Sequence, residues 1–342
     1  MANLTKASQE LFRRTPDECF SSFEALHAHC REERESSTDV WQPPQLLLPK
    51  VSDLTVSLSL ESGTEARLND WSFSQLCRMA GVNRDTINRL SPDTASIALR
   101  ETLPQSEKPI QLLTANDTIR SVHGVAYTRL WNADLLDVVQ DYAGDFQPPQ
   151  KGFNGATGLY CGEQDLFCFL IDPLGWVEIG GQEFAPGFFV WNSEVGRRSL
   201  GVQAFWFQRI CANHIVWDAT EVVEFSRKHT ANVRDGLDEI RRIIEALVES
   251  RDARRDGFSR VMTKAMQESL GNDADEVLKV LTKHEIPRHL AKGALEIVPK
   301  TGNGFTIFAM VDALTRMTQS SRYAGERLDA DARVSSLLTL AV

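Results

Sequence analysis

Five stretches of alternating apolar and polar residues follow one another closely between residues 159 and 207, and this run limits the possible folds most strongly. They read LYCG, DLFCFLID, GWVEIGG, QEFAPGFFVWN and RRSLGVQAFWFQ. Alternation with a period of two is typical of β-strands, and the pair Gly180-Gly181 is typical of a hairpin turn. Strands that are consecutive in the chain usually pair as neighbours. The run therefore predicts an antiparallel meander, with one apolar face and one face carrying outward polar residues such as Ser199 and Gln203.

The sequence on either side of the meander predicts helices and further strands. Residues 69–92 predict two short helices with Gly81 in the turn between them. They suggest either a DNA-reading helix-turn-helix or a helical hairpin inside a larger domain, and the hairpin is favoured because Asp85 adds negative charge to the second helix. Residues 53–60, 108–116 and 118–129 alternate like strands, whereas the pattern after residue 230 is helical.

We therefore expect an α+β fold in which a curved antiparallel sheet is preceded by a helical hairpin and followed by a helical C-terminal region. The expected organisation has three parts. Residues 1–50 form a peripheral N-terminal helix and linker, residues 51–230 form an α+β core with a central sheet, and residues 231–342 form a helical region packed on that core.

Composition limits the class of protein. The chain has 342 residues, of which 42% are hydrophobic and 25% charged, as in ordinary globular proteins. Its longest apolar run is far shorter than the roughly 20 residues that cross a bilayer, and the first fifteen residues lack the apolar core of a secretory signal. The six cysteines are scattered, which is typical of reduced thiols. These features predict a cytoplasmic protein with no membrane partner.

The block from residue 191 to residue 230 combines basic, aromatic and polar side chains in a chain of net charge −10. No Asp or Glu occurs between Val195 and Trp217. Arginine suits phosphate oxygens and aromatic rings suit bases. The pattern predicts a nucleic-acid interface, unless the aromatic residues are core and the charges form a solvated rim. The candidate contacts are Arg197, Arg198, Arg209, Arg227, Lys228 and Trp206.

The same block contains polar residues that would be catalytic if the protein were an enzyme. A nucleophile hypothesis uses Ser193 or Cys211 with His214 or His229 as the base. No GxSxG motif surrounds either nucleophile, and such residues also cap backbone groups where strands end. The full polar cluster is Asn192, Ser193, Glu194, Cys211, Asn213 and His229.

Metal binding has little support in the sequence. His27 and His29 lie two residues apart in a predicted helix, so they point to different faces and are expected to be solvated. Cys161 and Cys168 lack CxxC spacing. Cys211, His214 and His229 form an unusual ligand set, and we expect no metal and no cofactor.

Three blocks resemble a known family: WNSEVGRRSLGV, FQRICANHIVW and SRKHTANV. They are similar to the phage- and plasmid-associated family called domain of unknown function 932, as are DWSFSQLCRMAGV and FTIFAMVDALTRMTQ, so that the resemblance covers roughly residues 70–320. His214 departs from the glycine expected after Cys-x-Asn. The polar positions that match the family pattern are Asn192, Ser193, Glu194, Gly196, Arg209, Cys211, Asn213 and His229. The resemblance implies a mobile-element product.

Together these observations predict a non-catalytic protein that handles nucleic acid in a phage or plasmid. We expect it to bind single-stranded DNA on the sheet, to form a homo-oligomer and to assist annealing or recombination. The alternatives are an enzyme that uses the polar cluster and an interaction protein of the host-takeover or anti-defence kind, for which acidic net charge is natural.

Overall fold

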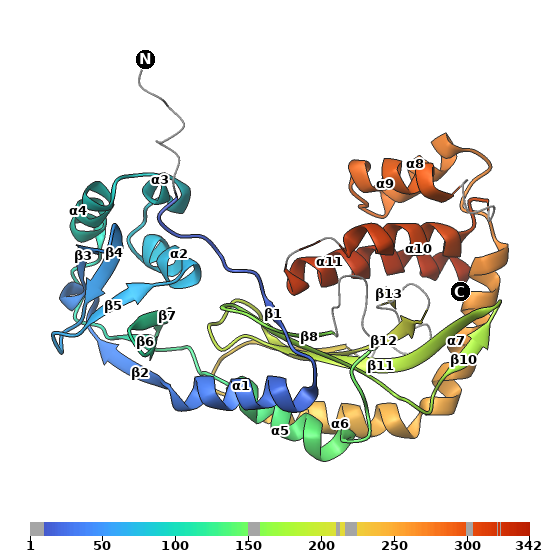
Figure 1. Cartoon of the computed structure of the whole chain (residues 1–342), viewed down its shortest axis with the longest axis horizontal. Helices are drawn as coiled ribbons and strands as arrows, with labels where there is room; N and C mark the ends of the chain where they lie inside the picture. Colours follow the sequence, from blue (N-terminus) through green and yellow to red (C-terminus); the bar gives the residue numbers. More distant parts are fainter. Residues whose placement is uncertain are drawn as a thin grey trace.

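The computed structural model describes residues 10–149, 158–209, 213–215, 224–298, 304–319, 321 and 323–342. Two β-sheets lie side by side, and helices cover them and continue to the C-terminus (Figure 1). The expected α+β class, with a curved sheet and a helical C-terminal region, is confirmed. The chain begins in one sheet, enters the other and then returns to the first, so the junction between them is built from segments far apart in sequence.

The first sheet has six strands and holds the N-terminal lobe together. Its order is β2 (Ser37–Gln42), β6 (Ile110–Ala115), β7 (Thr118–Gly124), β5 (Glu65–Leu68), β4 (Thr55–Ser59) and β3 (Leu48–Ser52). All pairs are antiparallel except β5 with β7. Its apolar face packs against α2 (Asp70–Met79), α3 (Arg84–Asn88) and α4 (Pro92–Thr102), and a 3₁₀ turn (Pro44–Leu46) joins β2 to β3.

Helices α2 and α3 form the expected hairpin within this lobe. Asn69 caps α2 in a reciprocal capping box with Ser72, and Asn83 caps α3. Between them Gly81 has a φ of +68°, a conformation that glycine adopts without strain. Because α2 packs on the sheet through buried residues such as Phe73 and Leu76, the hairpin is part of the larger domain, as predicted.

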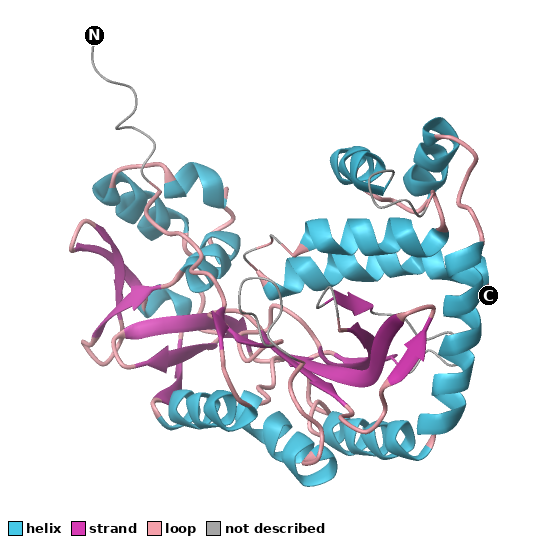
Figure 2. Ribbon diagram, turned by 45° about the vertical axis from the view of Figure 1, so that its right-hand side comes forward, coloured by secondary structure: helices cyan, strands magenta, loops and turns pink. Residues whose placement is uncertain are grey.

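The second sheet contains the predicted meander. Its order is β1 (Glu18–Cys19), β8 (Leu159–Cys161), β9 (Leu166–Ile171), β11 (Gln182–Asn192), β12 (Leu200–Gln208) and β13 (Asn213–Ile215), while β10 (Val177–Ile179) pairs with β11 and β14 (Glu224–Arg227) pairs with β12. Gly180 and Gly181, both with positive φ, make the turn between β10 and β11. The long strands β11 and β12 curve strongly (Figure 2).

Both faces of this sheet are covered, which corrects the expectation of a polar outer face. Leu170, Phe188 and Val202 face α1 (Phe23–Glu35), α5 (Asn132–Ala143) and α6 (Asp235–Glu249), which lie below the sheet in Figure 1. Phe169 and Phe205 face the other side, where α11 packs. The remaining helices are α7 (Arg251–Gln267), α8 (Ala274–Lys283), α9 (Arg288–Ile297), α10 (Ile307–Thr318) and α11 (Ala324–Ser335), followed by a 3₁₀ turn (Ser336–Ala341).

The two sheets divide the chain differently from the expected three parts. Strands β2 and β3, between residues 37 and 52, belong to the six-stranded sheet, so residues 1–50 are not peripheral. Residues 51–230 do not share one central sheet, because their strands are split between two. The alternation of residues predicted where strands lie but not which strands pair with each other. Pairing between strands that are far apart in sequence leaves no local pattern. Among the described helices, none combines the length and apolar composition that crossing a membrane requires.

Candidate functional site

The connection between β11 and β12 (residues 193–199) docks the eight-stranded sheet onto the N-terminal lobe. Val195 is buried, and its carbonyl accepts hydrogen bonds from Trp71 Nε1 at 2.8 Å and from His123 Nε2 at 3.0 Å. Gly196 follows with a φ of +69°, and a Cβ there would lie 2.7 Å from His123 Cε1. The turn therefore needs glycine for both its conformation and its close approach to the lobe.

Glu194 anchors this turn from inside. Its side chain is buried and accepts hydrogen bonds from the Asn132 backbone N–H at 2.8 Å and from Arg120 Nη1 at 3.2 Å. Its backbone carbonyl accepts from Arg129 and from the Tyr127 hydroxyl. Burial raises the pKa of Glu194, whereas Arg120 opposes that rise. The buried carboxylate is stabilised by a buried guanidinium and by a backbone N–H donor.

The side chains of Asn192 and Ser193 also form hydrogen bonds inside the protein. Asn192 Nδ2 donates to the carbonyl of Leu130 and to Asn132 Oδ1, both at 2.9 Å. Ser193 Oγ donates to the carbonyl of Gln164 at 2.5 Å and accepts from the Arg197 backbone N–H at 2.9 Å. The triplet, which the enzyme alternative places in a catalytic pocket, is thus a buried hydrogen-bonded junction in which Ser193 is fully buried.

His229, one of the two bases that the nucleophile hypothesis offered, lies at the edge of the same junction. The rings of His123 and Tyr127 stack at a centroid distance of 3.6 Å, and His229 lies 5.5 Å from Tyr127. Burial lowers the pKa of His123 to about 3 and that of His229 to about 4. Both rings are therefore neutral at physiological pH and add no positive charge.

An open groove lies beside the docked turn, between α2, the strands β6 and β7, and the β11–β12 connection. Its volume is about 690 Å³, within the range of ligand sites. Arg78 reaches it from α2 and Arg197 from the connection, and both side chains are exposed. Within the described residues, neither guanidinium forms an ion pair with a carboxylate. The full lining is Trp71, Gln75, Arg78, Met79, Ile110, Val122, His123, Gly124, Gly196 and Arg197.

Only one of the six predicted nucleic-acid contacts lines this groove. Arg197 does, while three other arginines are paired with carboxylates: Arg198 with Asp329 at 2.9 Å, Arg209 with Glu183 at 2.9 Å and Arg227 with Asp235 at 3.7 Å. Lys228 is exposed on the segment after β14. The prediction for Trp206 is wrong, because its indole is buried and stacked on Phe258 at 4.0 Å. The alternation of the strand points this ring into the core.

Some predicted residues lie outside what the structure describes. Cys211 is one of them, and only the backbone of Asn213 and His214 is described, in β13. The nucleophile hypothesis built on Cys211 and the zinc set of Cys211, His214 and His229 therefore stay predictions.

Sequence reasoning missed most of the groove and one cluster of metal-ligand type. Trp71, Gln75 and Arg78 come from the segment predicted to be a helical hairpin inside a larger domain, although their i, i+4 and i+7 spacing places them on one helix face. The second miss is on α1, where His27 is buried and lies 2.9 Å from Asp137, contrary to the expectation of a solvated ring.

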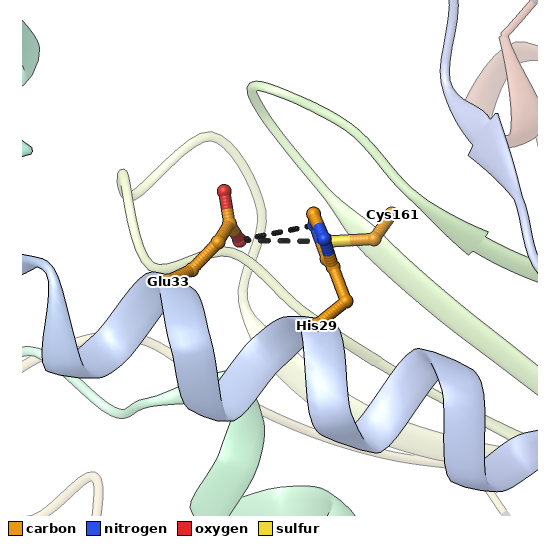
Figure 3. Close-up of side chains that lie close together, drawn as sticks. All are labelled: His29, Glu33 and Cys161. Atoms are coloured by element: carbon orange, nitrogen blue, oxygen red, sulfur yellow. Dashed lines mark hydrogen bonds and ion pairs between the residues drawn. The ribbon is translucent and has the colours of Figure 1, made fainter.

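The cluster of metal-ligand type consists of His29, Glu33 and Cys161, and it is the one such group within the described part of the chain (Figure 3). The Cys161 thiol also contacts the Cys30 thiol. The hydrogen bond with Cys161 raises the pKa of His29 to about 9.

Comparison with protein-family models, curated proteins and solved structures found no match. The resemblance to the phage- and plasmid-associated family therefore stays a prediction, and the function rests on the geometry of the groove.

Proposed function

We propose that the groove beside the docked turn binds single-stranded nucleic acid, without catalysing a reaction. The observation that carries the proposal is the pair Arg78 and Arg197. They come from two different parts of the fold, line the same open groove and lack carboxylate partners within the described residues. Unpaired arginines that share a groove suit the planar, bidentate recognition of phosphate oxygens.

The rest of the lining fits an unstacked base rather than a duplex. Trp71 gives an aromatic surface, and its ring is fixed by the hydrogen bond from Nε1 to the Val195 carbonyl. Aromatic stacking binds bases of any sequence and needs them exposed, as they are in a single strand. Ile110 and Val122 add apolar surface, and Gln75 has an amide whose nitrogen lies 3.5 Å from His123 Nε2.

Charge in the groove comes from the arginines alone, because burial lowers the pKa of His123 to about 3. The net charge of −10 makes long-range attraction of a polyanion weak, so binding depends on this local pair. The proposal therefore predicts binding that is sensitive to salt and insensitive to pH between about 6 and 8.

The test is fluorescence anisotropy with a labelled oligothymidylate, at low and at physiological salt. We expect wild-type protein to prefer this strand over a duplex of the same length, and unlabelled thymidine monophosphate to compete only weakly. A lack of binding at low salt would exclude the proposal. Equal competition by the mononucleotide would instead assign the groove to a free nucleotide.

Assistance in annealing and assembly into a homo-oligomer extend the same proposal. Wild-type protein should then speed the pairing of two complementary labelled strands, and an Arg78→Ala/Arg197→Ala variant should not. Sedimentation with and without the oligothymidylate measures the assembly. A monomer in both conditions would remove the oligomer from the proposal while leaving the binding test standing.

A further inference from the structure

Helix α1 presents two side chains of metal-ligand type to the end of β8. His29 and Glu33 are four residues apart and therefore lie on the same face of the helix. Both point toward Cys161, the last residue of β8, as Figure 3 shows. The possible ligand atoms of the three residues all lie within 4.8 Å of one another.

We infer that His29, Glu33 and Cys161 form a zinc-binding site. The set combines an imidazole nitrogen, a carboxylate oxygen and a thiolate sulfur, the three ligand types that Zn²⁺ accepts. A site with a thiolate ligand is unfavourable for Mg²⁺ and Ca²⁺, because these ions prefer oxygen ligands.

The distances between the side chains fit a tetrahedral ion. Zinc–ligand bonds of about 2.0 Å to nitrogen and oxygen and about 2.3 Å to sulfur imply an N···O separation of roughly 3.3 Å and an S···O separation of roughly 3.5 Å. His29 Nε2 lies 3.6 Å from Glu33 Oε2, and Cys161 Sγ lies 3.9 Å from the same oxygen. Both separations are a few tenths of an ångström longer than these values, and the histidine nitrogen and the sulfur lie within 4.8 Å of each other.

The surroundings support the ligands and leave a route for the ion. Arg120 Nη2 lies 3.4 Å from Glu33 Oε1 and donates a hydrogen bond to Oε2 at 3.5 Å, so it holds the carboxylate whose Oε2 also faces the histidine and the thiol. Ligating carboxylates are commonly held in this way by a second partner. Cys161 is buried, but His29 and Glu33 are partly exposed, which opens one side to solvent and to a water as fourth ligand.

The site joins segments that local sequence does not connect. Helix α1 runs from β1 of the eight-stranded sheet to β2 of the six-stranded sheet. An ion held by two residues of α1 and one of β8 fixes this connecting helix to the sheet. Zinc should therefore stabilise the folded protein as well as bind to it.

The experiment uses the full-length, metal-free protein and Zn²⁺ or Co²⁺ alone. We expect one equivalent of Zn²⁺ in competition with a chromophoric chelator, and a thiolate-to-cobalt charge-transfer band with Co²⁺. Cys161→Ala and His29→Ala should each weaken zinc binding by more than the roughly 10- to 100-fold that loss of an outer partner causes. Zinc should raise the melting temperature of wild type but not of these variants.

Cys77→Ala is the matched control, because it removes a buried thiol of the N-terminal lobe that is not part of the cluster. It should keep the site and the cobalt band. If Cys161→Ala does not fold, His29→Ala and Glu33→Gln replace it in the test, because both residues are partly exposed and their substitution should not prevent folding. No bound equivalent in wild type, or zinc binding by folded His29→Ala and Glu33→Gln equal to that of wild type, would overturn the inference.

Discussion

The buried junction and the open groove meet at one turn, yet they use polar residues in opposite ways. Glu194 is enclosed and its carboxylate oxygens are held by Arg120 and the Asn132 backbone. Three residues later Arg197 is exposed, and within the described residues it has no carboxylate partner. The comparison teaches that residue type does not separate a structural cluster from a binding surface. The availability of hydrogen-bonding groups to a ligand does.

Removing the carboxylate of the junction should give the largest effect. Glu194→Ala leaves the buried Arg120 guanidinium with Glu33 as its remaining carboxylate partner, and removing one partner of a buried charge pair costs about 3–5 kcal/mol. Urea unfolding should show this loss as a lower midpoint. Glu178→Ala, which removes an exposed glutamate from β10, should change the free energy of unfolding by less than about 0.5 kcal/mol. Equal effects of the two variants would contradict the structural role of the junction.

The turn itself can be probed with two glycines of similar backbone conformation. Gly196→Ala combines a φ of +69° with a Cβ contact of 2.7 Å to His123, whereas Gly181→Ala has a φ of +76° and open space around it. Positive φ costs about 1–2 kcal/mol for alanine in both, so the excess loss in Gly196→Ala measures the contact with the lobe. We expect Gly196→Ala to be the less stable of the two. A match between them would mean that the turn does not press on His123.

Acid should weaken the junction through His229. Its pKa is about 4 in the folded protein against an ordinary 6.5, because burial disfavours the charged ring. Between pH 6.5 and about pH 4 the His229 ring is protonated in the unfolded chain but neutral in the folded protein. The free energy of unfolding therefore falls as the pH is lowered through this range. At pH 5 the loss of unfolding free energy is about 2 kcal/mol, because each pH unit below 6.5 costs about 1.4 kcal/mol.

A His229→Gln variant isolates this contribution, because all other titrating groups are common to both proteins. The difference in unfolding free energy between wild type and variant should shift by about 2 kcal/mol between pH 7.5 and pH 5, in favour of the variant. Unfolding curves at the two pH values measure it. A difference that stays constant would show that the ring titrates normally.

The sequence predicted elements better than it predicted sites. The alternation of residues 159–207 and the Gly180-Gly181 turn gave the meander because they are local signals. The same pattern could not tell that Phe258 of α7 covers the Trp206 ring, so Trp206 was predicted to stack on a base. Asn192 and Glu194 are held by Asn132 and Arg120, 60 or more residues away, and Ser193 is held by Gln164. Such contacts leave no trace in local spacing.

The groove and the metal-type cluster were missed for the same reason. Arg78 and Arg197 are more than a hundred residues apart in sequence and meet only because the turn docks on α2. The His29 and Glu33 spacing was visible in the sequence, but its third member, Cys161, lies on a strand that only the fold brings to α1.

The most direct test of the groove compares two double variants that remove the same positive charge. Arg78→Ala/Arg197→Ala removes both positive charges from the groove, whereas Arg209→Ala/Arg227→Ala removes arginines that are already paired with carboxylates. The first should weaken oligothymidylate binding by about 100-fold, at roughly 1.5 kcal/mol for each charged hydrogen bond, and should reduce the salt slope by about 1.4. The second should leave both close to wild type. Equal losses in the two proteins, or a greater loss in the second, would contradict binding in the groove.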